Sequence, residues 1–146
     1  MITLITFSDN FHHFDTAISE YKKRLGKNFE LVQLKPSKKR TPKEIIQDET
    51  IQLQKKLEKM KGYKVVMSVA GKQLSTEDLS HTIEKYTQTH SHIIFIIGGS
   101  YGMNEDDLNN YIDSKISLSK MTFPHALAVL NLTEQIYRCN QIQKNT

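Results

Sequence analysis

Glycines are concentrated in one short stretch of the chain, residues 98–102 (GGSYG), directly after the apolar run 92–97. Adjacent glycines at the end of a strand allow positive φ and let the backbone approach a ligand closely. A tight turn without a ligand explains the same residues equally well. The stretch is not a dinucleotide-binding loop, because Ser stands where the third position of that pattern needs Gly, and the chain has no Gly-Lys-Ser/Thr phosphate loop. NAD and ATP chemistry are therefore poorly supported.

A second stretch, residues 118–125 (LSKMTFPH), combines hydroxyl, amine, thioether and aromatic side chains. This mixture suits the wall of a nucleobase pocket, although an ordinary connection between a strand and a helix is the simpler interpretation. His125 lies near the predicted start of the last helix, where the positive end of the helix dipole disfavours a protonated imidazole. It is a candidate hydrogen-bonding group or base, and a structural cap is equally consistent.

The remaining charged and titratable groups give weaker indications. Residues 35–43 (KPSKKRTPK) carry five basic side chains and no acid, which suits RNA phosphates, while a solvated loop is the commoner explanation. Glu134 and Arg138 are spaced for an ion pair within the last helix. The six histidines and the single cysteine show no metal-ligand spacing, so we expect no metal site.

Short apolar runs alternate with helical patterns along the chain, and they would position these stretches. We predict strands at residues 2–7, 29–34, 64–70, 92–97 and 115–119. We predict helices at residues 11–25, 41–60, 75–86 and 124–142, with a short one capped by Asn104. Thr41 and Ser75 are suited to cap the second and third helices, and Gly26 to end the first.

This alternation predicts an α/β fold with a mostly parallel sheet of five to six strands and helices on both faces, in one domain over residues 1–146. Ligands of such sheets bind beyond the carboxyl ends of the strands. The loops after Ala70, Ile97 and Ser119 are therefore the expected ligand-binding regions.

Composition narrows the class of protein further. The chain of 146 residues has a net charge of +4, too mild to establish an anionic partner. No apolar run approaches the length of a membrane span and no signal peptide is visible, so we expect no membrane association and a cytoplasmic location. The last helix is apolar on several sides, which indicates deep burial or packing against a partner subunit.

Three segments are highly specific when they occur together in this order: GGS at 98–100, SKMTFPH at 119–125 and EQIYR at 134–138. With them, and over nearly its whole length, the sequence resembles the ribosomal large subunit methyltransferase H family, within the SPOUT class. The resemblance implies a C-terminal trefoil knot, a homodimer and S-adenosylmethionine as methyl donor. It also implies methylation of N3 of a pseudouridine in 23S ribosomal RNA, on the assembled ribosome.

By motif position, the resemblance implies a donor site of eight residues. These are Met67, Gly98, Leu118, Ser119, Lys120, Met121, Thr122 and Phe123. In that setting His125 is a candidate for assisting loss of the N3 proton, and Arg138 for stabilising charge on the uracil carbonyls or holding a phosphate.

Relatives usually continue into a short tail with Tyr, His and a basic residue, which is associated with the active site. The present sequence ends at Asn145 and Thr146 without that tail. This departure motivates a second hypothesis, in which the chain is a non-catalytic RNA-binding or ribosome-assembly factor that retains the fold.

Overall fold

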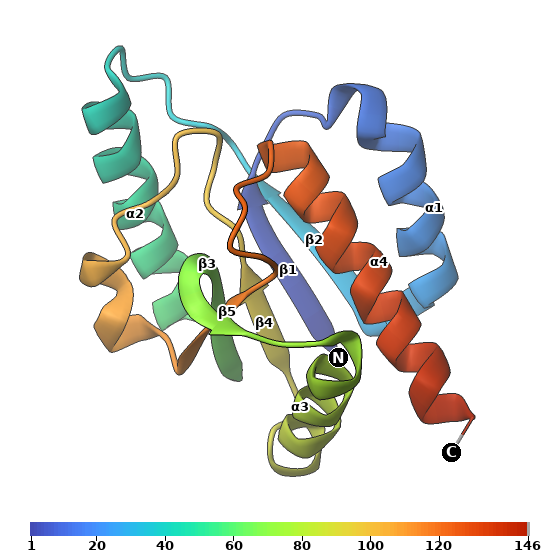
Figure 1. The fold of residues 1–146 in the computed structure, drawn as a ribbon. Helices are drawn as coiled ribbons and strands as arrows, with labels where there is room; N and C mark the ends of the chain where they lie inside the picture. The colour runs from blue at the N-terminus through green and yellow to red at the C-terminus, as the bar shows by residue number, and fades with distance from the viewer. Residues whose placement is uncertain (146) are drawn as a thin grey trace.

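The computed structural model describes residues 1–145, and Figure 1 shows a twisted sheet between two layers of helices. The strands are β1 (Ile2–Phe7), β2 (Phe29–Leu34), β3 (Tyr63–Gln73), β4 (Ile93–Ile96) and β5 (Ser114–Ser117). They form one five-stranded sheet in the order β2-β1-β4-β3-β5, and every neighbouring pair is parallel. The predicted α/β class is confirmed, with a fully parallel sheet in place of a mostly parallel one.

The helices cover both faces of the sheet, as predicted (Figure 1). They are α1 (Asp15–Leu25), α2 (Pro42–Glu58), α3 (Thr76–Thr89) and α4 (His125–Lys144), with 3-10 turns η1 (His12–Phe14), η2 (Gly26–Asn28) and η3 (Asp106–Tyr111). One core joins α1, α3 and α4 to the sheet, and a smaller one joins α2 and η3 to its other face. Alternate residues of β4 enter the two cores, with Phe95 in the first and Ile96 in the second.

Local chemistry explains most of the helix ends. Thr41 Oγ1 accepts the Glu44 N–H at 3.2 Å, and Ser75 Oγ accepts the Asp78 N–H at 3.0 Å, so both predicted caps are confirmed. Gly26 ends α1 with φ 72°, a conformation that favours glycine. The predicted Asn104 cap is wrong, because the following element is a 3-10 turn whose N-cap is Glu105 and which has no side-chain cap hydrogen bond.

The strand ends nearest the candidate ligand loops differ from the prediction. β3 continues past Ala70 to Gln73, with an irregularity in which Met67 and Lys72 both align with Ile116 of β5. A Cβ at Gly71 would lie 2.7 Å from the Ile116 nitrogen, so only glycine lets β3 return to β5 there. β5 ends two residues earlier than expected, which leaves residues 118–124 as an irregular connection to α4. The knot implied by the resemblance stays a prediction.

Candidate functional site

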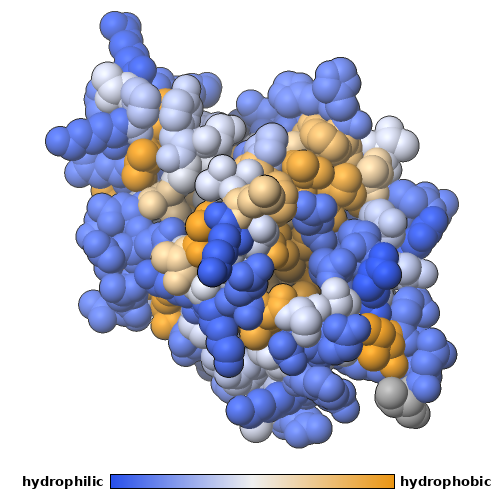
Figure 2. All heavy atoms as spheres, in the orientation of Figure 1, coloured by the Kyte–Doolittle hydropathy of each residue, from blue (hydrophilic) through white to orange (hydrophobic). Residues whose placement is uncertain are grey.

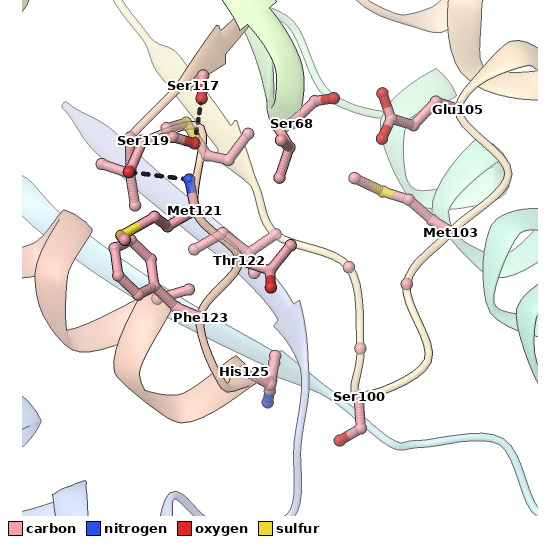
Figure 3. Close-up of a pocket in the computed structure, with 18 residues that line it drawn as sticks. Ser68, Ser100, Met103, Glu105, Ser117, Ser119, Met121, Thr122, Phe123 and His125 are labelled. Carbon is pink, nitrogen blue, oxygen red and sulfur yellow. Dashed lines mark hydrogen bonds between the residues drawn. The ribbon is translucent and has the colours of Figure 1, made fainter. Parts of the chain in front are cut away.

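A cavity of about 280 Å³ lies at the carboxyl ends of the central and outer strands (Figure 3). Its wall comes from three segments that are distant in sequence. These are residues 67–69 of β3, residues within 97–105 after β4, and residues within 117–125 between β5 and α4. The strand order β1-β4-β3-β5 places these three ends side by side. Two of the three predicted loops meet here, and β3 contributes through its irregular segment because it does not end at Ala70.

Seven of the eight residues implied for the donor site line this cavity: Met67, Gly98, Leu118, Ser119, Met121, Thr122 and Phe123. The eighth, Lys120, is exposed and does not line it. Two hydrogen bonds shape the turn around Lys120: Ser117 Oγ donates to the Ser119 carbonyl at 2.7 Å, and the Met121 N–H donates to Ser119 Oγ at 3.0 Å (Figure 3). The implied place of Lys120 in the donor site stays a prediction, and the structure shows its side chain exposed outside the cavity lining.

In the glycine loop (residues 98–102), the room for a side chain restricts the residue type at Gly98 and Gly99 more than the backbone torsion angles do. Only Gly102 has positive φ, at 85°, and its N–H donates to the Gly99 carbonyl at 2.9 Å. A Cβ at Gly98 would lie 3.1 Å from the Gly102 carbonyl carbon, and one at Gly99 would lie 2.5 Å from Glu49 Oε1. Gly98 and Gly99 do not use the positive φ that glycine allows. A side chain at Gly98 would need the backbone at Gly102 to shift slightly, and one at Gly99 would need the Glu49 carboxyl to move.

His125 is the first residue of α4 and lines the cavity. Its Nε2 lies 2.6 Å from Thr6 Oγ1, and the same hydroxyl lies 3.4 Å from the Gly98 carbonyl oxygen. Burial lowers the pKa of His125 and so favours the neutral imidazole that the helix position predicted. Thr6 is fully buried in β1 and joins the last helix to the glycine loop.

Sequence reasoning missed Thr6 because β1 lies beside β4 only in the folded sheet. The only sequence signal for Thr6 was its place near the end of the first predicted strand, since ligands of parallel sheets bind at the carboxyl ends of the strands.

One acidic side chain, Glu105, also lines the cavity. Its Oε1 lies 3.5 Å from Lys115 Nζ, and both side chains are about one-third exposed. Figure 3 shows the carboxylate on the same side of the cavity as Met103 and Ser68. Sequence analysis did not single out this residue, because its carboxylate meets the cavity through the path of the loop rather than through a motif. Lys115 pairs with this carboxylate, so the negative charge that Glu105 presents to the cavity is partly compensated.

Arg138 lies apart from this cavity. It is 13 positions beyond His125 on α4, roughly 20 Å along a helix axis. Its Nη2 pairs with Glu134 Oε2 at 2.9 Å, so the predicted ion pair within the helix is confirmed. His125 and Arg138 of one chain therefore do not meet at one reaction centre.

Within residues 1–145 no group of three or more His, Cys, Asp or Glu side chains is placed to hold a metal ion. Across the same residues, no helix has the length and apolar character that crossing a lipid bilayer demands.

Comparison with known proteins agrees with this geometry. All of residues 1–146 match the family described as "Predicted SPOUT methyltransferase". The chain is 37% identical over 137 residues to ribosomal RNA large subunit methyltransferase H of Ruminiclostridium cellulolyticum, covering 88% of this chain and 86% of the relative. A relative of the same name from Clostridium perfringens is 35% identical with the same coverage. The one from Fusobacterium nucleatum is 33% identical, covering 91% and 88%.

These matches confirm the resemblance drawn from the three sequence segments, and they make the chain an enzyme that transfers a methyl group. With the family model matched from end to end and the motif residues gathered around one cavity, this protein belongs to the SPOUT methyltransferases.

Proposed function

We propose that this chain methylates ribosomal RNA, that S-adenosylmethionine is its donor, and that the target is N3 of a pseudouridine in 23S ribosomal RNA. One observation carries the proposal. Seven residues that the family resemblance implies for donor binding line a single cavity at the carboxyl edge of the sheet. The substrate is inferred from the relatives, which are named as large-subunit ribosomal RNA methyltransferases.

The residues around the cavity fit S-adenosylmethionine in shape and charge. Met67, Leu118 and Phe123 offer apolar contact for an adenine ring. The same three residues border an adjoining cavity of about 340 Å³, so an extended ligand has room on both sides of them. Glu105, whose carboxylate also pairs with Lys115 at 3.5 Å, is the acidic side chain of the wall that faces the sulfonium and ammonium charges of the donor. When bound, the donor supplies an electrophilic methyl carbon.

His125 is the side chain best placed to handle the proton of the acceptor. In one consistent arrangement, the His125 Nε2–H donates to Thr6 Oγ1, with the nitrogen and oxygen 2.6 Å apart. The Thr6 hydroxyl then donates to the Gly98 carbonyl, with the two oxygens 3.4 Å apart. That arrangement leaves Nδ1 as the acceptor atom of the ring. As N3 of the base gains its methyl group and loses its proton, His125 accepts that proton at Nδ1. The cavity wall also lowers the activation barrier by orienting donor and acceptor, by up to about 7–11 kcal/mol in favourable cases.

A homodimer is part of the proposal. Met121 and Phe123 border the donor cavity with 73% and 36% of their surface exposed, and a second copy would cover them. Arg138 lies too far along α4 to reach the cavity of its own chain, so any role in catalysis requires the cavity of the second copy. The basic loop at residues 35–43 would attract the RNA backbone without reading its sequence. A cytoplasmic location follows from a ribosomal substrate.

The decisive test is methyl transfer to ribosomes. Ribosomes purified from a strain that lacks the methylase are incubated with the protein and donor labelled on the methyl group. We expect label in 23S RNA, located at N3 of a pseudouridine by mass spectrometry of nuclease fragments. Tight donor binding in calorimetry without any incorporation would overturn catalysis and favour the ribosome-assembly factor. Equal labelling of free nucleosides would overturn the ribosomal substrate.

A further inference from the structure

Apart from the adjoining cavity of about 340 Å³, a cavity of about 440 Å³, here called the second cavity, lies beside the donor cavity on the side of β1 and β2. Its wall includes residues 7–10 at the end of β1 and in the loop that follows, Ser37 in the loop after β2, and Glu49 of α2. Ser100 and His125 line both cavities and form their common boundary. A ligand in the second cavity is therefore within reach of the imidazole to which the proposed function gives the proton transfer.

The wall of this second cavity carries two carboxyl groups with unused acceptor atoms. Glu49 is only 2% exposed; its Oε2 accepts the Ser37 N–H at 2.9 Å, while its Oε1 is buried without a hydrogen-bond partner among residues 1–145. A buried polar atom left unpaired is costly, and a ligand that donates a hydrogen bond is one explanation of it. Asp9 is exposed, and its carboxylate makes no hydrogen bond or ion pair to the rest of the described chain.

The charges around the second cavity suit a nucleotide whose base lies inside the cavity and whose phosphate lies outside it. The exposed Asp9 carboxylate disfavours an anion at the cavity, and both carboxyl groups offer oxygen acceptors to ring N–H donors. Directly outside, Pro36 and Ser37 continue into the basic residues of the 35–43 loop, where phosphates are favoured. Tyr101 lines the cavity with 55% of its surface exposed, which offers a ring on which a base can stack.

The loop that supplies Asp9 is held in an unusual backbone conformation. His12 has φ 52°, the one positive value among the non-glycine residues of the described chain. Its N–H donates to Asn10 Oδ1 at 3.0 Å, and Ser8 Oγ donates to the Asn10 carbonyl at 2.6 Å. Such conformations persist where the surroundings determine them strongly, and they are frequent at binding sites. The cavity wall is therefore a built feature of the fold.

We infer that this second cavity holds the target base itself, flipped out of the RNA, with its N3 edge at the Ser100–His125 boundary and its N1–H donated to the carboxyl groups of Asp9 or Glu49. The inference rests on the proposed function, which it deepens by locating the acceptor. Pseudouridine carries ring N–H groups at both N1 and N3, whereas uridine has its N1 bonded to ribose. The two carboxyl groups thus supply a means of choosing pseudouridine over uridine. Flipped bases are read in this way, by hydrogen bonds to their edges and by stacking.

The test compares two ribosome preparations, one with pseudouridine at the target and one from a strain without the pseudouridine synthase, which keeps uridine there. Asp9→Asn and Glu49→Gln replace an acceptor oxygen with a donor amide at nearly constant volume. We expect at least one of them to lower kcat/KM on pseudouridine ribosomes about tenfold, with a smaller change on uridine ribosomes. Tyr101→Ala should raise KM on both. Asp106→Asn, an exposed acid outside both cavities, is the matched control.

Donor affinity, measured by calorimetry, and melting temperature accompany each assay, so a misfolded variant is recognised and the other two decide. If wild-type protein transfers no methyl group, the proposed function fails and not the location of the base. If wild-type protein is active while all three variants match it on both ribosomes, the inference is overturned. It is also overturned if turnover falls only in step with donor affinity, because the residues would then act on the donor site.

Discussion

The first strand carries the same pair of groups at both of its ends. Thr3 and Thr6 are fully buried, and each hydroxyl oxygen lies 2.6 Å from Nε2 of a histidine, His92 for Thr3 and His125 for Thr6. Burial lowers the pKa of both histidines, helped at His92 by the positive N-terminus. By local chemistry alone, neither pair is the more functional one.

The surroundings of the two pairs are different. At the amino edge, the His92 carbonyl accepts the Tyr63 N–H at 2.8 Å, and Gly62 packs against the same carbonyl. Tyr63 in turn stacks on Tyr86 with ring centroids 3.7 Å apart. At the carboxyl edge, His125 stands in the wall of two cavities, one on each side of it. The loops, rather than the strand, therefore decide which threonine–histidine pair can take part in chemistry.

The largest expected effect is the loss of donor binding when a larger side chain is placed in the glycine loop at the carboxyl edge of the sheet. Gly98→Val adds a branched side chain where even a Cβ lies 3.1 Å from the Gly102 carbonyl carbon. The glycine loop must shift into or away from the donor cavity, so we expect S-adenosylmethionine binding to fall below detection in calorimetry, with circular dichroism that still shows a folded protein.

Gly62→Ala is the counterpart at the amino edge, where φ is 150° and a Cβ would lie 2.6 Å from the His92 oxygen. That variant should lower the melting temperature and leave donor affinity of the folded protein unchanged. Normal donor affinity in Gly98→Val would remove the glycine loop from the site.

The next effect separates the two threonines. Thr6→Val and Thr3→Val each remove one hydroxyl from a buried histidine contact, at a cost of about 1–3 kcal/mol in stability. Only Thr6→Val should also slow methyl transfer, by about tenfold in kcat, because His125 loses the contact that orients its ring and selects its tautomer.

Single-turnover rates and chemical denaturation of both variants measure the two effects. Equal rates for the two variants would show that the Thr6–His125 contact is structural.

The comparison also shows how far the sequence could predict the molecule. The apolar run at 92–97 and the caps Thr41 and Ser75 were predictable, because periodicity and capping depend on residues within a few positions of each other. Thr6 and Glu49 were not, because their roles arise from strand order and from the approach of α2 to Gly99.

Lys120 is the reverse case, a residue that the motif implied for the site and that does not line the cavity. The motif implied a site residue, and hydrogen bonds on either side of it turn the chain so that its side chain is exposed and the cavity is lined without it. A motif thus predicts which segment forms a site more securely than which of its side chains face it.

A smaller effect concerns pH. Because burial lowers the pKa of His125, its neutral form persists below the ordinary value of about 6.5. We therefore expect kcat/KM for methyl transfer to stay level as the pH falls to about 6.5 and to decline only below it. His125→Gln should abolish this acid limb along with most of the rate, whereas His92→Gln should leave the limb in place.

Stability has its own pH dependence of the same sign. Histidines that are buried neutral must be charged on unfolding in acid, so the free energy of unfolding falls as the pH drops through about 6.5 toward the lower pKa of the folded state. His92→Gln should flatten that slope in urea titrations. An acid limb of kcat/KM that disappears in His92→Gln would contradict the distinction between the two edges.

The smallest effect comes from Glu49, the buried acid at the carboxyl edge. Burial raises its pKa and the Ser37 N–H opposes that rise, while nearby Asp48 adds to it. A raised folded pKa means that the folded state holds its proton longer than the unfolded one, so wild-type stability is lost as the pH rises through the folded value. Glu49→Gln does not titrate. Its stability relative to wild type should therefore improve as the pH rises from below the ordinary glutamate value of about 4.3 toward neutrality, as measured by urea denaturation. A difference that is constant with pH would show that folding leaves the pKa of the Glu49 carboxyl unchanged.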